Sequence, residues 1–446
     1  MTHLHSGDTR EARKVATASF LGTTIEWYDF FLYGAAAALV FGPQFFPAGD
    51  PVVSQLGSFA TFAIGFLTRP LGGVLAGHFG DRLGRKRILI LSLLVMGGST
   101  VLVGLLPNYA QIGVAAPVLL VLLRLVQGLA VGAEWGGAAL MAVEHAPPKR
   151  RALYGSSTQL GVPAGAILSN LMMLVLSWLT GAAFTDWGWR IGFVASIVLV
   201  VYGLVVRRRL TESPLFTRAV RTGPARVPLL DVLRRYPAGV VTAVLATAAS
   251  SAIGYTVLTF TLSYAPKADG FSRNDVLLMG ILASLVQMVA MAWAGSAADR
   301  FGRRRTMVIG TVVQVAAALL LFPLLDTRVW VLALLACTFG AVSNVAQYAP
   351  LPAVMSDLFP TTVRYTGSSL GYQIGGIVGG SFAPIIATGI LAASGSSFMI
   401  GVYLAGLTVV SGVAAFLAHT APLTRRAQAE DAAVVAGEPK AAPVAE

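Results

Sequence analysis

Two acidic residues, Glu26 and Asp29, stand three positions apart within the first long apolar stretch of the chain. At the 1.5 Å rise of an α-helix that starts near residue 15, Glu26 lies roughly 16 Å deep, close to a bilayer midplane. Residues three apart share a helix face, and two close carboxylates in a low dielectric do not both ionise cheaply. We therefore expect one of them to carry a proton, as proton-coupled transport requires. The alternative is permanent neutralisation by arginines on other helices.

Two arginines also fall inside apolar stretches, at Arg69 and Arg124. Arg124 is about 12 residues into its expected helix, again near the midplane. A guanidinium keeps its charge and fits a carboxylate with two parallel hydrogen bonds. Arg124 is thus a candidate ligand for a substrate carboxylate, or a partner of Asp29 that a proton displaces, with a static ion pair as the alternative. Arg69 precedes Pro70, which favours a helix kink, so binding and structural roles are equally open.

Neutral polar residues complete the candidate binding set. Tyr28 and Gln127 adjoin the charged residues, whereas Gln347 and Tyr372 come from a later part of the chain whose apolar stretches hold polar but uncharged side chains. We expect the early part to handle charge and the later part to supply shape and hydrogen bonds; packing is the alternative for the tyrosines. The sequence shows no catalytic constellation and no Cys/His spacing suited to zinc, so we expect neither an enzyme nor a metal or cofactor.

Composition decides what kind of scaffold holds these residues. Charged residues are 12% of the 446 positions and apolar residues 56%, against about 25% charged in soluble proteins. Apolar runs long enough to span a bilayer recur along the whole chain. They neither alternate nor stay short, as barrel strands would. The sequence therefore predicts an all-α membrane protein.

The runs divide into twelve expected helices, six on each side of a basic segment. The predicted organisation is an N-terminal leader (1–14), a first six-helix half (15–206), a basic central loop (207–236), a second six-helix half (237–418) and a disordered tail (419–446). Part of the central loop, from residue 229 to 235, is expected to form a surface helix.

A polar stretch occurs twice, at residues 77–87 and 295–305, each time between two apolar runs. Glycine, Asp-Arg, glycine and a basic cluster fall at matching positions, and a repeat at about half the chain length indicates two related halves. We expect each stretch to form a cytoplasmic latch that stabilises an outward-facing state through ion pairs and helix-end contacts, although its cations alone would also anchor a loop. The copy in the second half should matter less, because that half lacks buried charge. The candidate gating residues are Asp81, Arg82, Arg85, Glu134, Glu144, Arg151, Asp299, Arg300 and Arg303.

The net charge of +12 does not indicate nucleic-acid binding, because of where the cations lie. They cluster in every second loop, which is the pattern of cytoplasmic loops in membrane proteins. Arg190, Lys267, Arg273 and Arg328 are the exceptions that fall in the alternate loops. We therefore expect a multi-pass protein of the cytoplasmic membrane with both termini in the cytoplasm, the lipid bilayer as its surroundings and a functional monomer.

The repeated stretches resemble the cytoplasmic loop motif of the major facilitator superfamily, Gly-x-x-x-Asp-Arg-x-Gly-Arg-Arg/Lys. Further motifs resemble the metabolite:H+ symporter family, which includes shikimate, 2-oxoglutarate, citrate and proline/betaine porters; they lie at residues 26–30, 68–70, 124–128, 132–137 and 364–367. The resemblance runs from about residue 15 to residue 418. It implies a twelve-helix fold, alternating access and proton-driven uptake of a small polar metabolite.

These observations together predict symport of a proton with a small organic acid or zwitterion, either an organic anion or a betaine-like molecule, driven by the proton gradient. The binding site is expected at the midplane between the halves, and the two buried arginines favour an anion. One alternative is a proton-antiporting exporter, because the helix expected from residue 152 to 179 carries several glycines and Pro163. Another is a transporter-like sensor, which would need a larger soluble domain than residues 207–236 provide.

Overall fold

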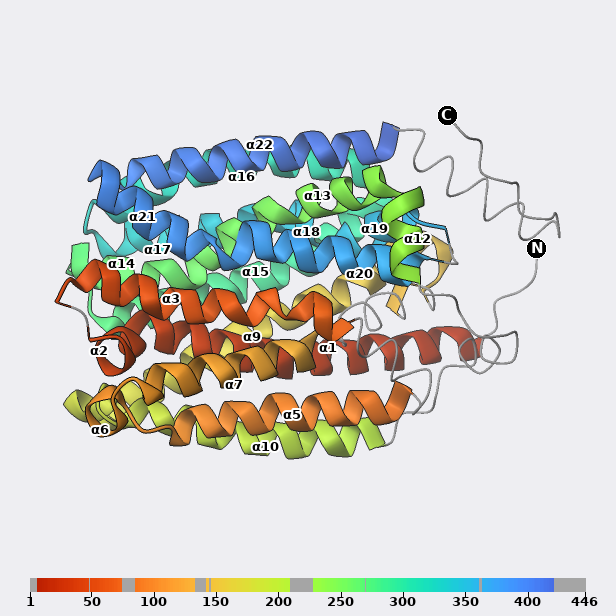
Figure 1. Cartoon of the computed structure of the whole chain (residues 1–446). Helices are drawn as coiled ribbons and strands as arrows, with labels where there is room; N and C mark the ends of the chain where they lie inside the picture. Colours follow the sequence, from red (N-terminus) through yellow and green to blue (C-terminus); the bar gives the residue numbers. More distant parts are fainter. Residues whose placement is uncertain are drawn as a thin grey trace.

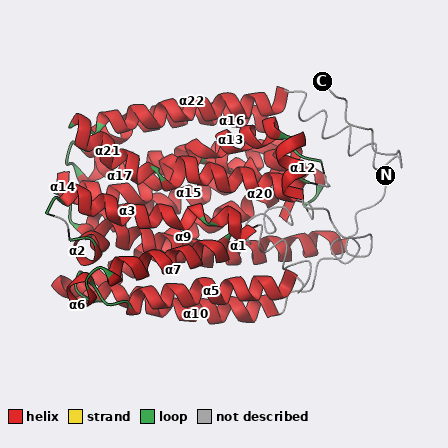
Figure 2. Ribbon diagram, viewed as in Figure 1, coloured by secondary structure: helices red, strands yellow, loops and turns green. Residues whose placement is uncertain are grey.

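A computed structural model gives the structure of the chain. It describes residues 6–47, 49–73, 85–132, 142–143, 146–208, 228–268, 270–360 and 363–420. Within these ranges the regular structure is helical throughout, and long helices lie side by side along one direction (Figures 1 and 2). Helices suit a bilayer because each satisfies its own backbone hydrogen bonds where water is absent.

The first half begins with α1 (Ser6–Ala36), which continues through the π-helix η1 (Ala37–Phe41) into α2 (Gly42–Phe45). The elements that follow are α3 (Pro51–Leu67), α5 (Arg85–Leu105), α6 (Tyr109–Ile112), α7 (Ala115–Val131), η2 (Pro148–Arg150), α9 (Arg151–Thr180), η3 (Gly181–Phe184) and α10 (Gly188–Arg208).

Before the second half lies the short helix α12 (Pro228–Arg235), in the segment where the sequence predicts a surface helix. The second half itself comprises α13 (Pro237–Tyr255), η4 (Thr256–Phe260), α14 (Thr261–Ala268), α15 (Arg273–Phe301), α16 (Arg303–Leu325), α17 (Trp330–Ser343), α18 (Val345–Tyr348), α19 (Leu351–Asp357), α20 (Arg364–Gly375), η5 (Gly376–Ser381), α21 (Ala383–Ser394) and α22 (Phe398–Thr420).

Twelve spans account for these elements, as predicted. Among the described residues, nine stretches are long and apolar enough to cross a membrane, and α5 and α7 contribute two shorter apolar helices. The twelfth is α1, whose carboxylates Glu26 and Asp29 make it less apolar. Two details differ from expectation. Helix α1 begins at Ser6, inside the expected leader. The span from Trp330 to Asp357 is interrupted near Asn344 and Pro350.

The two halves meet along several helices. The longest contact joins α9 to α15, while α3 packs against η5 and α21, and α1 packs against η4. Within the first half, α1 lies along α9 and also contacts α10. Every residue from Thr23 to Ala38 is consequently buried. Surrounding helices thus shield the carboxylates of α1 from lipid.

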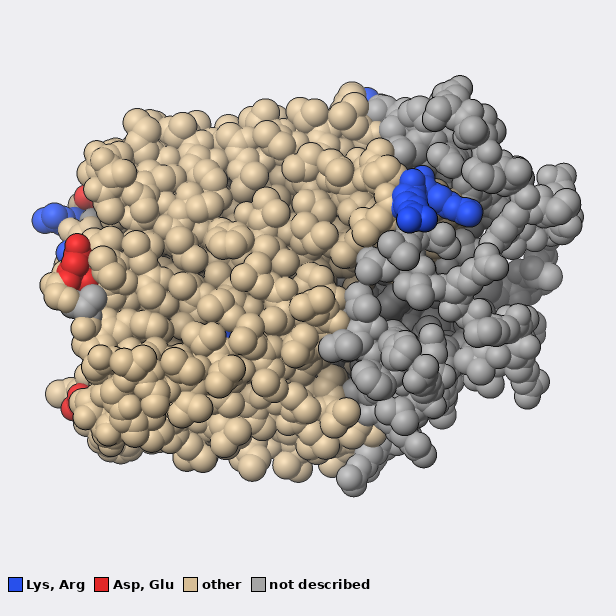
Figure 3. Space-filling view, viewed as in Figure 1, with Lys and Arg blue, Asp and Glu red and all other residues tan. Residues whose placement is uncertain are grey.

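The outer surface fits an apolar solvent. Large apolar side chains such as Trp178, Val289 and Trp293 are strongly exposed on the outside of the bundle. The face drawn in Figure 3 is almost free of charge along its middle, and its coloured charged residues gather at the two ends. We call the end that carries residues 295–305 the turn end, and the opposite end the far end.

Candidate functional site

A small cavity lies within the first half, between α1, α3, α5 and α7. Its lining includes all four charged residues that the sequence places inside helices: Glu26, Asp29, Arg69 and Arg124. Each is at most 4% exposed. The structure therefore brings the predicted charges into one site, and that site lies inside one half rather than midway between the two.

Glycines let α3 and α7 approach closely enough to form this cavity. A Cβ atom at Gly128 would overlap the carbonyl oxygen of Gly65, and one at Gly132 would overlap the carbonyl oxygen of Arg69. A Cβ at Gly65 would itself overlap Nε of Arg124. The long side chain of Arg124 thus occupies space that is open only because position 65 has no side chain.

Arg124 is held by one hydrogen bond and by aromatic rings. Its Nη1 donates to Oε1 of Gln127 at 2.6 Å, and its guanidinium carbon lies 4.0 Å from the ring centre of Tyr33 and 5.1 Å from that of Phe30. Its buried Nε and Nη2 have no hydrogen-bond partner among the described residues. A buried donor without an acceptor costs about 1–3 kcal/mol. The arrangement therefore leaves N–H groups ready for a carboxylate.

Asp29 is joined to Arg124 indirectly. Its Oδ2 accepts a hydrogen bond from Oγ1 of Thr100 at 3.1 Å, and the same Thr100 oxygen accepts one from Nε2 of Gln127 at 2.7 Å. Oδ1 of Asp29 is buried and has no partner among the described residues. Asp29, Thr100, Gln127 and Arg124 thus form one hydrogen-bonded chain across α1, α5 and α7. The sequence analysis did not single out Thr100, because a lone threonine in an apolar helix carries no distinguishing signal.

Arg69 lies in the helical continuation of α3 and faces the other carboxylate. Its Nη1 is 4.0 Å from Oε1 of Glu26, and its guanidinium carbon lies 4.5 Å from the ring centre of Phe66 and 4.9 Å from that of Phe30. Nε of Arg69 is buried without a hydrogen-bond partner among the described residues. The two arginines therefore share the ring of Phe30, and each is held by rings at least as much as by ion pairs.

The second half closes this region with an aromatic ring. Tyr255, at the end of α13, lies 5.5 Å from the ring centres of both Phe30 and Phe66, and 6.1 Å from that of Trp27, on which it stacks. Aromatic pairs in such geometries stabilise a contact beyond the area they bury. At these rings the described contact between the halves is therefore aromatic, whereas the four charged side chains of the cavity all belong to the first half.

The other substrate-binding candidates lie in different places. Gln127 lines the cavity. Tyr28 points away from it toward α10, where its hydroxyl donates to the carbonyl of Gly192 at 3.2 Å. Gln347 is 1% exposed and donates to Thr311 at 2.7 Å, and the hydroxyl of Tyr372 lies 2.7 Å from that of Tyr348. Gln347 thus bonds within the second half, whereas Tyr372 pairs with Tyr348, whose carbonyl accepts a hydrogen bond from Nε2 of Gln159 in the first half at 3.4 Å.

The gating candidates are described only in part. Asp81, Arg82, Glu134 and Glu144 lie outside the described residues, and Arg85 begins α5 with a side chain that is not described. Arg151 is exposed at the start of α9, and the guanidinium of the exposed Arg300 lies over the ring of Phe301 at 5.3 Å. Arg303 forms an ion pair with Asp357 of its own half.

Asp299 makes a contact between the halves at the turn end. Its two carboxylate oxygens accept hydrogen bonds from the backbone N–H groups of Ala152 and Leu153 at 3.0 and 2.9 Å. These amides open α9, and a helix N-terminus favours a negative charge because its first N–H groups have no partner within the helix. The second copy of the repeated stretch therefore caps a helix of the first half.

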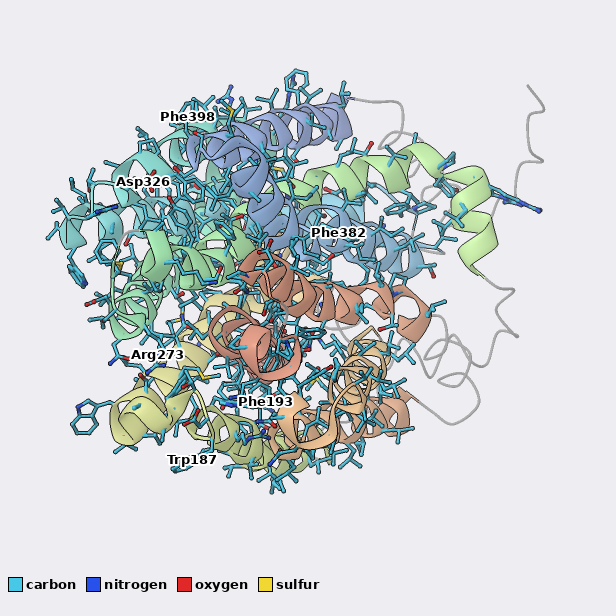
Figure 4. All side chains as sticks on the ribbon, turned by 60° about the vertical axis from the view of Figure 1, so that its left-hand side comes forward. Trp187, Phe193, Arg273, Asp326, Phe382 and Phe398 are labelled. Carbon is cyan, nitrogen blue, oxygen red and sulfur yellow. The ribbon has the colours of Figure 1, made fainter. Side chains whose placement is uncertain are left out.

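Polar contacts also join the halves at the far end. Nζ of Lys267 donates to Oε1 of Gln55 at 3.2 Å, and Nε of Arg273 donates to Oγ of Ser177 at 3.0 Å. Figure 4 turns this end toward the viewer and labels Arg273 and Asp326. Direct contacts between the halves are thus present at both ends of the bundle. Within the described residues no cluster of His, Cys, Asp and Glu could hold a metal ion.

A family model decides how this architecture is classified. The model described as Major Facilitator Superfamily matches residues 19–384 and 244–445. The chain belongs to the major facilitator superfamily. It is accordingly a multi-pass membrane transporter with the twelve-helix fold of that superfamily, and not an enzyme.

Relatives and solved structures agree with this classification. The chain is 44% identical to the inner membrane metabolite transport protein YhjE of Escherichia coli (strain K12), over 91% of this chain and 94% of the relative. It is 39% identical to the shikimate transporter of the same organism, again over 91% and 94%. The solved structure of the xylose transporter XylE from E. coli superposes with a TM-score of 0.72 at 17% identity, covering 93% of this chain and 98% of the other.

Proposed function

We propose that this transporter is a proton-coupled symporter that takes up a small organic anion across the cytoplasmic membrane. The observation that carries the proposal is the buried Arg124. It holds two N–H groups without hydrogen-bond partners among the described residues, in the same cavity as Asp29. A charge inside a membrane protein is expensive and is usually kept for function. A substrate carboxylate would supply the acceptors that Arg124 lacks.

Charge balance in the cavity favours symport over exchange. Glu26 and Asp29 offset Arg69 and Arg124, so the four groups cancel when both carboxylates are ionised. A proton on Asp29 would leave one net positive charge, which attracts an anion. Proton and anion then favour each other's binding, and that mutual coupling defines a symporter. In an exporter that exchanges protons for a cationic substrate, proton and substrate would instead compete for the carboxylates.

The surroundings of Asp29 suit it better than Glu26 for carrying the proton. Glu26 faces the guanidinium of Arg69 at 4.0 Å. Asp29 has one oxygen without a partner among the described residues, and its other oxygen accepts from a neutral hydroxyl. A carboxylate that lacks a facing cation is the one that gains most from a proton. We therefore assign proton coupling to Asp29.

The aromatic rings around Arg69 bear on which class of substrate the cavity favours. Proline/betaine transport is named for a further relative, the Escherichia coli protein that is 32% identical over 90% of this chain. A quaternary ammonium would seek the faces of Phe30, Phe66 and Trp27. The guanidinium of Arg69 already lies over all three rings. This occupation favours an organic acid, such as the shikimate named for another relative, over a betaine.

Gating then follows from the contacts at the two ends. We assign the turn end to the cytoplasm, with both termini, and the far end to the outside. Asp299 would latch the cytoplasmic end by capping α9, with Arg303 and Asp357 bracing the same turn. Opening the outer end would break the contacts of Lys267 with Gln55 and of Arg273 with Ser177. The predicted roles of Asp81, Arg82, Arg85, Glu134 and Glu144 remain part of this proposal.

Uptake by proteoliposomes tests the proposal. Purified protein is first screened by thermal shift against organic acids, and the stabilising acids are then assayed under an inward proton gradient. We expect accumulation that collapses with an uncoupler. Asp29→Asn should abolish accumulation against a gradient while leaving exchange of substrate for substrate, because a neutral amide binds no proton. Asp326→Asn, at the far end, is the matched control. If Asp29→Asn still accumulates substrate in a pH-dependent way, Asp29 is not the coupling residue.

A further inference from the structure

We propose that Thr100 is a positioning residue that transmits protonation of Asp29 to the anion site at Arg124. The inference rests on the proposed function and adds a route for the coupling. Thr100 is 0% exposed in the middle of α5, and its hydroxyl contacts both Asp29 and Gln127. No ion pair between Asp29 and Arg124 is present among the described residues, so the hydroxyl and the amide are the link between them.

A hydroxyl has one hydrogen to donate and lone pairs to accept with. When Asp29 is ionised it can only accept, so the hydrogen of Thr100 points to its Oδ2. A lone pair of Thr100 then accepts from Nε2 of Gln127 at 2.7 Å. The amide is thereby fixed with its oxygen toward Nη1 of Arg124, at 2.6 Å. While Asp29 is ionised, Gln127 thus stays hydrogen-bonded to the guanidinium of Arg124.

Protonation reverses the first bond in the chain. Protonated Asp29 carries a hydrogen of its own and donates it to Oγ1 of Thr100. The hydrogen of Thr100 turns to the carbonyl of Met96, which already lies 3.1 Å away. The oxygen of Thr100 then accepts from both Asp29 and Gln127, one on each lone pair. It becomes a weaker acceptor for the amide, because its own hydrogen no longer goes to a charged carboxylate and a second donor draws on the same oxygen. Gln127 releases Nη1 of Arg124, which becomes available to the substrate carboxylate. One proton binds at Asp29, and none is transferred farther.

Further charged and titratable groups, on α1 and on other elements, also act on Asp29. Arg124 of α7, Arg69 beside α3 and Glu26 of α1 line the same cavity, and Tyr255 of the second half packs against Phe30. None of the described cavity residues of α5, and none from α9 or α10, is charged. These groups affect Asp29 through space whether or not Thr100 is present. Loss of the hydroxyl should therefore weaken the coupling between the two sites without removing proton binding or the part of the coupling that acts through space.

The neighbouring residue provides a matched control. Ser99 donates to the carbonyl of Val95 at 2.7 Å, which is the ordinary bond of a helical serine to the preceding turn. Thr100 makes the equivalent bond to Met96 and has the two contacts to the site in addition. Ser99→Ala removes a hydroxyl from the same turn of the same helix and leaves the chain from Asp29 to Arg124 intact.

The experiment compares Thr100→Val, which keeps the shape and loses the hydroxyl, with Thr100→Ser and Ser99→Ala. The dissociation constant of shikimate is measured at acid and at alkaline pH. The same measurement is then made with the acid that stabilises the protein most in the thermal-shift panel. We expect the ratio of the two dissociation constants to be at least about fivefold in the wild type. It should fall by at least about half in Thr100→Val, because the hydrogen-bonded route is lost while the through-space charge coupling remains, and it should stay near the wild-type value in the other two variants. A wild-type ratio in Thr100→Val, or an equal loss in Ser99→Ala, overturns the proposal.

A second measurement needs no ligand. The melting temperature of each variant is followed against pH, alone and combined with Asp29→Asn. A residue that acts through Asp29 changes the pH dependence of stability, and this change disappears in the double variant. A merely structural loss lowers the melting temperature equally at every pH and overturns the proposal. If the wild type binds no acid in a pH-dependent way, the proposed function fails, while this cycle still decides the role of Thr100.

Discussion

The two halves share a six-helix plan but differ in what they bury. The first half encloses two arginines and two carboxylates in one cavity, where N–H groups of both arginines and one oxygen of Asp29 have no hydrogen-bond partner among the described residues. The second half buries amides and hydroxyls that bond to one another: Gln287 donates to Asn344 at 3.1 Å, and Gln347 donates to Thr311 at 2.7 Å. The halves therefore differ in what they bury, charged groups in the first and neutral amides and hydroxyls in the second. Each half also has buried polar atoms without a partner among the described residues, Oε1 of Gln287 among them.

This difference assigns different work to the halves. Charge in a low dielectric responds strongly to a proton or to an anion, because each changes the local balance by a full unit. A neutral network responds little to either and instead fixes the shape of the surface that it lines. The first half is thus suited to binding and coupling. The second half supplies Tyr255 as a cover and Asp299 as a cap on α9.

Arg124 offers the sharpest test of this division. Arg124→Gln should lower the initial rate of substrate uptake at least about thirtyfold, because truncating one partner of a buried charged pair costs about 2–5 kcal/mol. Arg124→Lys keeps the charge but loses the forked geometry and should recover little of the rate. Initial rates in proteoliposomes measure both variants. Arg190→Lys is the control, since Arg190 binds backbone carbonyls of Gly104 and Leu106 instead. Near-normal uptake by Arg124→Gln would remove the anion site from the first half.

A smaller effect is expected when the arginine is kept but displaced. Gly65→Ala puts a methyl group where Nε of Arg124 lies, so the guanidinium must shift. We expect about a tenfold loss of substrate affinity, since a misplaced charged hydrogen bond costs about 1.5–3 kcal/mol. Gly98→Ala is the matched control, because a Cβ there meets no atom within 4 Å. Dissociation constants from thermal-shift titration distinguish the two. Equal behaviour of the two variants would mean that the position of Arg124 is not critical.

Much of the fold was predictable because its signals are local. Apolar length alone locates the spans, and the repeated polar stretch marks the halves before any contact is known. The buried charges of the site were predictable for the same reason: Glu26, Asp29, Arg69 and Arg124 are conspicuous in apolar surroundings. Their shared cavity in one half was not predicted, since it depends on how closely α3 and α7 approach at their glycines.

The unpredicted parts of the site are residues whose types are ordinary in a helix. Thr100 and Tyr33 gain importance only from contacts with residues far along the chain, at Asp29 and Arg124 for example. Tyr33 had a weak signal, because it follows Asp29 by four positions and shares its helix face. The role of Asp299 at the start of α9 likewise depends on tertiary packing. The sequence predicted a helix-end contact for its stretch without indicating which helix.

The smallest effect should come from the second half. Gln347→Leu breaks the bonds to Thr311 and Ser250 without touching a charge. We expect KM to rise by about two- to fivefold, because one neutral hydrogen bond contributes about 0.5–1.5 kcal/mol. The ratio of uptake rates at acid and alkaline pH should stay that of the wild type. Gln127→Leu in the first half is the comparison, because Gln127 contacts both Thr100 and Arg124 and its loss should alter that ratio. A changed pH ratio in Gln347→Leu would place part of the proton coupling in the neutral half.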